Sequence, residues 1–412
     1  MRERDTQREG EGRDDRWTML VRAAWRVAAA LAPASAVPRG GPGSGGWRRG
    51  SGAANGEGTR GGGRGALFSE PQQPIGPAGD VVHGARLQFD DAVTLKLRRR
   101  ARLVWDEPPK DVLLVKRWRD APAANATREV AQWFRQRGVQ VHVERVVQEK
   151  EMPECHAFDA ATSRVDFCVT LGGDGTMLHL AGLFAGEWNM QSALPPVISF
   201  GMGSLGFLTP FPFEQYQDKL ARIMAAHKTP LYVTLRTRLR CEVYEGQELK
   251  MVTHVLNELA VDRGSNPALS TLDCYIDGNY VTTVHADGLL VATPSGSTAY
   301  NMAAGGAMVA PSVPCTLLTP LAAHSLSFRP FIVPESSHIE LKVPHNARTD
   351  VIATFDGRNT VSIPRGGSVK IATSEFPIPI INMHRYDIDW FNSLTHKLSW
   401  NTHATQLPLE RP

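Results

Sequence analysis

The sequence of 412 residues predicts an α/β domain with a parallel sheet, followed by a mainly β, sandwich-like domain. Three observations lead to this fold class. Short apolar runs alternate with segments of helical period between residues 110 and 228. From residue 229 the chain is rich in Val, Thr, Leu and Tyr with little helical period, which is typical of β-structure. Before residue 88, Gly and Arg largely replace the apolar residues that a core needs.

The α/β domain is predicted over residues 88–228. Asp111–Val115 is a short apolar run that predicts a buried strand, and Val130, Trp133 and Phe134 follow at helical spacing before a glycine. Further strands are predicted at Val139–Val143, Phe167–Leu171 and Pro196–Phe200, and further helices at Met177–Phe184 and Phe213–Ala226. Short connections between these segments favour a parallel sheet with helices packed on it.

The β-rich domain is predicted over residues 229–375, and Asp277-Gly278 within it is typical of a two-residue hairpin turn. Its strands are predicted within Leu231–Tyr244, Val252–Asp262, Thr271–Thr283 and Gly288–Thr293. The last segment, 376–412, is partly helical, and we expect it to pack back on the α/β domain. Its apolar residues at helical spacing are Trp390, Phe391, Leu394 and Leu398.

The head, residues 1–87, is predicted to be disordered because its composition buries little apolar surface. Residues 1–70 hold 15 of the 37 glycines and carry 12 Arg against 8 acidic residues. The remaining 33 basic and 34 acidic residues leave the folded part near neutral. Without an excess of cations there, we predict no nucleic-acid partner.

The sequence predicts no membrane span, since the Ala-rich stretch Trp17–Val37 is short and is interrupted by Arg22 and Arg26. We therefore expect a cytoplasmic protein that does not bind membranes, with an organellar presequence in the head as the alternative. Five widely spaced cysteines without a CxxC pair are typical of free thiols in a reducing compartment.

The most informative motif is Gly172-Gly173-Asp174-Gly175-Thr176, which lies between a predicted strand and a helical run. Ligands of open α/β sheets bind at the carboxyl ends of strands. Glycines let backbone N–H groups approach a phosphate, and the helix N-terminus favours an anion. The predicted phosphate-binding residues are Gly172, Gly173, Gly175 and Thr176. Asp174 can accept a proton from a hydroxyl or bind Mg²⁺, with helix capping as the alternative role.

Four further elements carry polar groups. Gly201–Gly206 fits the G-x-G-x-x-G pattern, but two following prolines prevent it from opening a helix, so we expect a loop that closes over an apolar or phosphate group. Asp287–Tyr300 runs from a buried strand into hydroxyl and amide donors for a polar ligand. Asn257-Glu258 sits in an apolar strand and needs a ligand or a buried partner. Phe355–Arg358 is compatible with a simple hairpin turn.

The signatures of P-loop enzymes and protein kinases are absent from the sequence. The motifs, in their order along the chain, instead resemble those of NAD kinases, especially the eukaryotic cytosolic type. The resemblance covers roughly residues 100–401 and also includes His324–Pro330. The GGDGT signature is shared with diacylglycerol-type lipid kinases, whereas the Asn-Glu pair and the Thr-Pro-Ser-Gly-Ser-Thr-Ala-Tyr stretch make the match specific.

The resemblance implies an NAD kinase or diacylglycerol kinase-like fold and transfer of the ATP γ-phosphoryl group, with Mg²⁺, to the 2′-hydroxyl of the adenosine ribose of NAD⁺. It implies Asp174 as the proton acceptor and leaves the metal ligands open. The residues it implies for binding NAD are Asp174, Gly175, Asn257, Glu258, Asp287, Thr298, Ala299, Tyr300, Asn301, Met302, Ala303 and Arg358. Family members are usually homo-oligomers, so a dimer or tetramer is expected.

Two alternatives differ from this hypothesis in class. A lipid kinase with the shared GGDGT loop needs an apolar acceptor pocket and a membrane-facing surface, and the sequence signals neither. A non-catalytic NAD-binding sensor would keep the pocket without turnover, and the intact Asp174 argues against it.

Overall fold

A computed structural model describes residues 81–82, 85–89, 100–160, 162–184, 194–203, 206–385, 387–398 and 400. Most of the predicted head lies outside these described residues, and so do Ser204 and Leu205 of the second glycine-rich loop. The chain divides into two units, Met1–Ile75 and Gly76–Pro412. The description that follows concerns the second unit alone.

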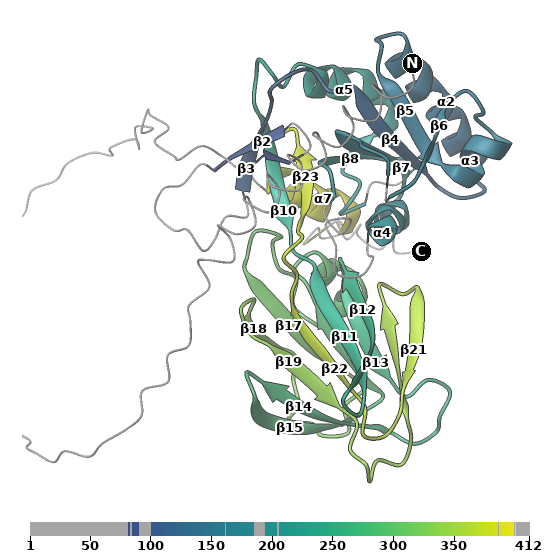
Figure 1. Ribbon diagram of the computed structural model, residues 1–412. Coiled ribbons are helices and arrows are strands. Elements are labelled where there is room, and N and C mark those ends of the chain that lie inside the picture. Colours follow the sequence, from purple (N-terminus) through teal and green to yellow (C-terminus); the bar gives the residue numbers. More distant parts are fainter. Residues whose placement is uncertain are drawn as a thin grey trace, which may run out of the picture. The chain divides into compact units, whose positions relative to one another are not determined.

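The α/β part is built on one sheet, with described strands in the order β1-β2-β3-β10-β23-β8-β7-β4-β5-β6 (Figure 1). The strands from β23 to β6 are parallel, which confirms the predicted parallel sheet, whereas β2, β3 and β10 add an antiparallel side. The strands are β1 (Val81–Val82), β2 (Ala85–Phe89), β3 (Arg100–Trp105), β4 (Asp111–Lys116), β5 (Gln140–Glu144), β6 (His156–Phe158), β7 (Phe167–Gly172), β8 (Val197–Gly201), β9 (Phe211–Pro212), β10 (Leu231–Arg236) and β23 (Ile378–Asn382).

Helices cover both faces of this sheet because successive strand residues point to opposite sides. Val112 and Leu114 of β4 belong to the core beneath α2 and α5, and Leu113 and Val115 belong to the core beneath α4. The helices of this part are α2 (Ala121–Arg135), α3 (Arg145–Lys150), α4 (Asp174–Leu183) and α5 (Tyr216–Met224), with a 3₁₀ turn at Phe213–Gln215. The parallel strands are therefore buried on both sides, as their continuous apolar runs predict.

The β part is a sandwich of antiparallel sheets, which confirms the predicted class. In the described residues, one sheet has the order β12-β11-β22-β19-β14-β15 and the other β18-β17-β16-β13-β20-β21 (Figure 1). Their inner faces share one apolar core. The strands are β11 (Leu239–Glu245), β12 (Glu248–Val255), β13 (Glu258–Asp262), β14 (Ser270–Ile276), β15 (Asn279–Ala286), β16 (Gly288–Ala292), β17 (Cys315–Leu321), β18 (Phe331–Pro334), β19 (Ile339–Lys342), β20 (Val351–Phe355), β21 (Asn359–Ile363) and β22 (Ser368–Thr373).

Two predictions about this part have different outcomes. Asp277-Gly278 forms the turn between β14 and β15, with φ of 50° and 78°, as the sequence predicts. The segment Leu231–Arg236, which the sequence analysis assigns to the β-rich half, instead pairs with β3 and β23 in the first sheet. A strand pattern shows which residues face a core, but it does not show which sheet the strand joins.

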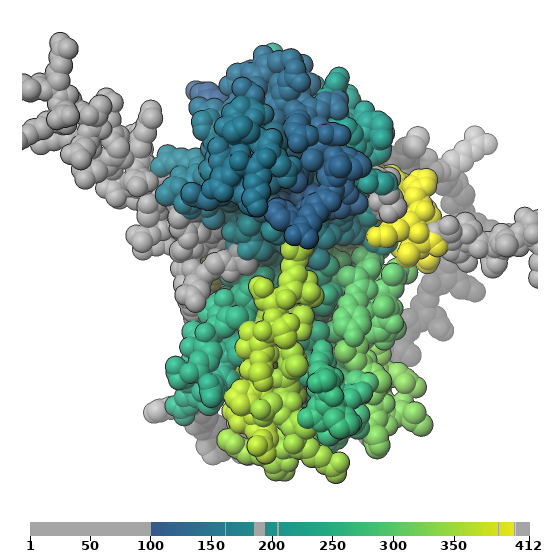
Figure 2. Space-filling model, turned by 90° about the vertical axis from the view of Figure 1, so that its right-hand side faces the viewer, coloured from purple at the N-terminus to yellow at the C-terminus, as the bar shows by residue number. Residues whose placement is uncertain are grey.

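The C-terminal helix α7 (Ile388–Leu398) packs against the second glycine-rich loop. Trp390 and Leu394 are buried there, and the Trp390 ring lies 6.2 Å from that of Phe207. Phe391 is 51% exposed, so it lies outside the buried face of this helix. Figure 2 shows this segment, in yellow, on the surface where the α/β part meets the β part.

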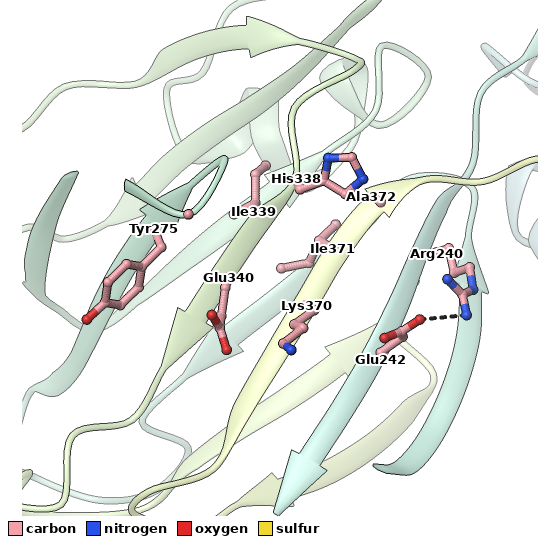
Figure 3. A pocket seen from close by; sticks show the side chains of 10 residues that line it. Arg240, Glu242, Tyr275, His338, Ile339, Glu340, Lys370, Ile371 and Ala372 are labelled. Carbon is pink, nitrogen blue, oxygen red and sulfur yellow. Dashed lines mark ion pairs between the residues drawn. The ribbon is translucent and has the colours of Figure 1, made fainter. Parts of the chain in front are cut away.

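A cavity of about 250 Å³ lies on the outer face of the sheet that contains β11, β22 and β19 (Figure 3). Arg240 and Glu242 form an ion pair there at 2.5 Å, and Glu340 and Lys370 lie on the neighbouring strands. None of the residues predicted for the site lines this cavity. Ligands of open α/β sheets bind instead at the carboxyl ends of the parallel strands. All five cysteines are buried and free, as predicted, and no helix in the described ranges is long and apolar enough to cross a membrane.

Candidate active site

The GGDGT motif connects the end of β7 to the start of α4. Gly172 is the last residue of β7, Gly173 caps the helix, and Asp174 is its first residue, so the helix begins three residues earlier than predicted. A Cβ at Gly172 would lie 2.1 Å from Thr176 Oγ1, so only glycine fits there. Gly172 is also the register partner of Gly201, which places the second glycine-rich loop next to the first.

The carboxylate of Asp174 is held by the segment Phe207–Thr209, which follows this second loop. Oδ2 accepts a hydrogen bond from Phe207 N, and Oδ1 accepts from Leu208 N and Thr209 Oγ1, each at 3.1 Å. Lys397 Nζ of α7 lies 3.5 Å from Oδ2. The segment Phe207–Thr209 therefore orients Asp174, and the closure of the preceding loop over an apolar or phosphate group stays a prediction. A carboxylate fixed in this way is suited to accept a proton from a substrate hydroxyl.

Cationic side chains line the cavity beside the GGDGT loop. The cavity has a volume of about 700 Å³ and is lined by Lys116, Arg117, Trp118, Glu144, Gly173, Gly175, Thr176, His179 and Arg358. Lys116 pairs with Glu151 at 3.0 Å, and Arg117 pairs with Asp120 at 3.1 Å. Because glycine N–H groups, a helix N-terminus and cations meet here, the cavity can hold a chain of phosphates.

The turn Phe355–Arg358 connects this cavity with the Asn257-Glu258 pair. Asp356 and Gly357 have φ of 49° and 65°, as a two-residue hairpin turn requires. Asp356 accepts hydrogen bonds from the backbone N–H groups of residues 256 to 258 at 2.7 to 3.2 Å. Arg358 donates to the Gly175 carbonyl and contacts His179 Nδ1 at 3.2 Å. The segment is therefore more than a simple turn, because it connects two predicted parts of the site.

Asn257 lies between β12 and β13, Glu258 is the first residue of β13, and the two are only 6% and 7% exposed. Among the described residues, Asn257 Oδ1 and Glu258 Oε2 have no hydrogen-bond partner. Burial and the nearby Asp356 carboxylate raise the pKa of Glu258 to about 7, although the N–H of Tyr300 donates to it. Buried acceptors without partners are costly, and a ligand with hydroxyl groups would satisfy them.

A second cavity, of about 610 Å³, brings together several residues of the predicted NAD set. Asp287, Tyr300 and Ala303 line it, and Arg263 Nε donates to Asp287 Oδ1 at 2.7 Å. The segment 296–303 consists of a 3₁₀ turn, Gly296–Thr298, and the short helix α6, Tyr300–Ala303. Its remaining predicted residues are the partly buried Thr298, Ala299 and Met302 and the fully buried Asn301.

The side chain of Asn301 forms its hydrogen bonds with other groups of the protein. Its Nδ2 donates to the carbonyls of Ser297 and Ala307 at 3.2 and 3.0 Å, and its Oδ1 accepts from Thr319 Oγ1 at 2.6 Å. The amide is thus satisfied within the protein. Asn301 is not among the residues that line the second cavity, and its side chain does not offer a polar group to it.

Two family models match the chain. The ATP-NAD kinase N-terminal domain matches residues 112–228, and the ATP-NAD kinase C-terminal domain matches residues 256–383. Together they cover more than half of the chain. The chain belongs to the NAD kinase family.

Two relatives that are named NAD kinases are similar to the chain in sequence. NAD kinase 2, chloroplastic, of Arabidopsis thaliana is 43% identical over 329 residues, which are 74% of this chain and 32% of the relative. NAD(+) kinase of Saccharomyces cerevisiae is 41% identical over 256 residues, which are 58% of this chain and 46% of the relative. The chain thus spans about a third of the length of the plant relative and about half of the yeast one.

A solved structure of yeast NADH kinase complexed with NADH is also similar, with a TM-score of 0.69 and 29% identity. The match covers 80% of this chain and 97% of that chain. The folded part of this NAD kinase family member therefore has the arrangement of domains found in that enzyme.

Several residues of the candidate site escape sequence reasoning. Lys116 is the last residue of β4, which neighbours β7, and Arg117 follows it. Their place at the carboxyl end of an apolar strand is a signal that could have found them. Arg236 is 6% exposed and donates to Ser295 Oγ at 3.3 Å. Burial lowers the pKa of Arg236 to about 10, against the opposing effect of Asp387 and Asp174. Nothing in the local sequence of Arg236 or of Lys397 shows that the folded chain brings its positive charge near Asp174.

Proposed function

We propose that the chain is an ATP-dependent NAD⁺ kinase, which phosphorylates the 2′-hydroxyl of the adenosine ribose of NAD⁺ to give NADP⁺. The observation that carries the proposal is Asp174, whose carboxylate is held by three hydrogen bonds beside a cation-lined cavity. The turn at Asp356 links it to a second region, where two buried acceptors have no partner in the described part of the chain. Membership of the NAD kinase family supports the same activity.

Asp174 acts as the general base in this proposal. The 2′-hydroxyl gives its proton to the carboxylate as its oxygen bonds to the γ-phosphorus, and the bond from that phosphorus to the β-phosphate oxygen breaks. The electron pair of the broken bond leaves with ADP. A ribose hydroxyl is a weak nucleophile at neutral pH, and a positioned base contributes a factor of roughly 10²–10⁴.

The phosphates of ATP are proposed to bind in the cavity beside the GGDGT loop. Backbone N–H groups of Gly172, Gly173, Gly175 and Thr176 are available at the start of α4, where the helix dipole favours an anion. Lys116, Arg117 and Arg358 supply positive charge from β4 and from the β20–β21 turn. The family resemblance implies that Arg358 binds NAD. Because Arg358 also contacts the Gly175 carbonyl, it is placed to bind where the two substrates meet.

NAD⁺ is proposed to use the buried acceptors and the second cavity. Asn257 Oδ1 and Glu258 Oε2 would accept hydrogen bonds from ribose hydroxyls or the adenine amino group. Tyr300 is 46% exposed and offers a ring to the adenosine half, beside Thr298 and Ala299. Asp287 would lie at the nicotinamide end. Ala303 lines the second cavity, and the partly buried Met302 lies beside it in the chain.

Mg²⁺ is proposed to enter with ATP. The described residues contain no group of three or more His, Cys, Asp or Glu side chains that could hold a metal ion. Mg²⁺ in phosphotransferases needs only one or two carboxylates besides the phosphates. Glu144 lines the cavity, and Asp174 belongs to the GGDGT loop beside it. The residues therefore fit the ion, which would neutralise charge on the transferred phosphates.

A cytoplasmic homo-oligomer, dimer or tetramer, is also proposed. Edge strand β15 exposes Tyr280 (57%) and Val281 (48%), and edge strand β18 exposes Ile332 (51%). Apolar groups on open edges favour association with another chain. Five free cysteines suit a reducing compartment. An organellar location through the head remains the alternative, and one relative carries the name chloroplastic.

A turnover assay tests the function directly. The full chain is incubated with NAD⁺, ATP and Mg²⁺, and the expected product is NADP⁺, detected with an NADP-specific dehydrogenase. Phosphorylation of diacylglycerol without formation of NADP⁺ would refute the proposal in favour of a lipid kinase. Binding of NAD⁺ without any product would instead indicate a non-catalytic sensor.

A further inference from the structure

The C-terminal helix α7 brings a cation to the carboxylate of Asp174. Lys397 Nζ lies 3.5 Å from Asp174 Oδ2, and the two side chains are 38% and 30% exposed. The same ammonium group lies 5.1 Å from the centroid of the Phe207 ring. Two partners thus hold the cation beside the reacting group, while both members of the ion pair remain open to solvent.

Other contacts hold α7 in place. Trp390 is buried against Phe207, and Ser393 Oγ donates to the Gly206 carbonyl at 3.3 Å. Since ion pairs that are open to solvent add little stability, anchoring the helix does not explain the position of Lys397.

The bonding pattern of Asp174 leaves one position that a substrate can take. Three donors of the segment Phe207–Thr209 occupy the carboxylate at 3.1 Å each. They are fixed by the backbone and by a buried threonine, whereas Lys397 reaches Oδ2 through a flexible, partly exposed chain. An arriving 2′-hydroxyl can therefore replace the ammonium group on Oδ2 without disturbing the three hydrogen bonds.

We propose that Lys397 is a catalytic residue, which binds Asp174 in the free protein and the transferred phosphoryl group during the reaction. This inference rests on the proposed function. The phosphorus must lie next to the 2′-oxygen, so an ammonium group displaced from Oδ2 is already within reach of the phosphoryl oxygens. The ammonium group of Lys397 balances their charge, while the proton of the 2′-hydroxyl goes to Asp174.

A second cation near Asp174 is less suited to this role. Arg236 is buried at 6% exposure, and its guanidinium is tied to Ser295 Oγ at 3.3 Å. It supplies a fixed positive potential, because its side chain has little room to follow the phosphoryl group. Lys397 is the mobile partner of the two.

The test compares variants of the full chain in the NADP⁺ assay. Lys397→Met is expected to lower kcat by roughly 10²–10³-fold, because one group that stabilises transition-state charge is lost. The KM for NAD⁺ should stay within about threefold, because the ground-state contacts of NAD⁺ are unchanged. Lys397→Ala should regain activity when ethylammonium is added. His396→Gln, an exposed neighbour on the same helix, is the matched control and should keep the wild-type kcat.

Two results would overturn the inference. One is a kcat of Lys397→Met within about threefold of the wild type. The other is a loss of kcat without any gain from ethylammonium in Lys397→Ala, which would indicate a structural role. Neither result touches the proposed function, which fails only when the wild-type chain itself forms no NADP⁺.

Discussion

The two polar regions of this NAD kinase family member are built in opposite ways. Around Asp174, the polar groups are partly exposed and paired, and cations surround them. Around Asn257 and Glu258, the polar groups are buried, and two acceptor atoms have no partner among the described residues. The turn at Asp356 and Arg358 touches both regions.

This difference separates chemistry from recognition. A base must exchange protons and partners during turnover, so it needs solvent-accessible, replaceable contacts such as that with Lys397. A recognition site discriminates best when its buried polar groups stay unsatisfied without the correct ligand. We therefore expect substitutions in the first region to change kcat, and those in the second to change stability and the KM for NAD⁺.

The largest effect is expected from Asp174→Asn. The amide keeps the shape of the side chain but cannot accept the proton, so kcat should fall by roughly 10²–10⁴-fold. Binding of NAD⁺, measured by calorimetry, should persist because the buried acceptors of Asn257 and Glu258 are unchanged. Equal turnover of variant and wild type would show that another group is the base.

A pair of glycine substitutions contrasts the two regions directly. A Cβ at Gly206 would lie 1.7 Å from Asp174 Oδ1, and a Cβ at Gly296 would lie 2.2 Å from the Asn257 carbonyl oxygen. Gly206→Ala therefore displaces the side chain of the proposed base, and a shift of about 1 Å can cost roughly 10²-fold in rate. Gly296→Ala displaces backbone and should lower the free energy of unfolding by about 1–3 kcal/mol.

Thermal unfolding and kcat are measured for both variants. Gly182→Ala is the control, since a Cβ there meets no atom within 4 Å. The contrast between the regions would be lost if Gly206→Ala destabilised the fold as much as Gly296→Ala did, with kcat unchanged.

Sequence reasoning found the parts of the site that depend on local order. Asp174 was identifiable because strand, glycine loop and helix are consecutive in the chain, and the structure has that order. The role of Asp356 could not be predicted, because its hydrogen-bond partners lie about a hundred residues away along the chain. Lys397 is further still from Asp174 along the chain, and only packing of α7 on Phe207 brings the two together.

The sequence also does not show whether a polar side chain is already paired. Asn301 and Asn257 are both buried amides in predicted binding segments, yet the first is satisfied and the second has a free Oδ1 among the described residues. The sequence likewise does not show which sheet a strand joins. Leu231–Arg236 has a strand pattern, but only the structure shows that it joins the first sheet through β3 and β23. Both outcomes depend on contacts distant in sequence.

Glu258 gives the second region a dependence on pH. Burial, followed by the Asp356 carboxylate, raises the pKa of Glu258 from 4.5 to about 7. The folded protein therefore binds this proton more tightly than the unfolded chain. The resulting stability is fully present below pH 4.5 and is lost as pH rises through about 7. The difference corresponds to about 3 kcal/mol.

Glu258→Gln should remove this dependence while keeping the shape of the side chain. Urea unfolding at about pH 5 and about pH 8 should show that the wild type loses more stability than the variant as pH rises. The variant should also raise the KM for NAD⁺, because the carboxylate acceptor is gone. Parallel pH dependence in the two proteins would place the titrating proton elsewhere.

The smallest effect is expected where the two regions meet. Arg358→Gln removes a cation from the cavity beside the GGDGT loop and its hydrogen bond to the Gly175 carbonyl. One charge-assisted hydrogen bond contributes about 1.5–3 kcal/mol, so the KM for ATP should rise by about tenfold or more. Because the base keeps its contacts, kcat should change less than the KM.

The matched control is Arg365→Gln, which removes an exposed arginine paired with Asp350 shortly after β21. It should leave both kinetic constants unchanged, since that guanidinium lies in neither region. If Arg358→Gln raised the KM for NAD⁺ and left that for ATP unchanged, the arginine would belong to the recognition region, as the sequence analysis first assigned it. A rise for ATP alone would place it with the phosphates, on the side of the turn that faces Gly175.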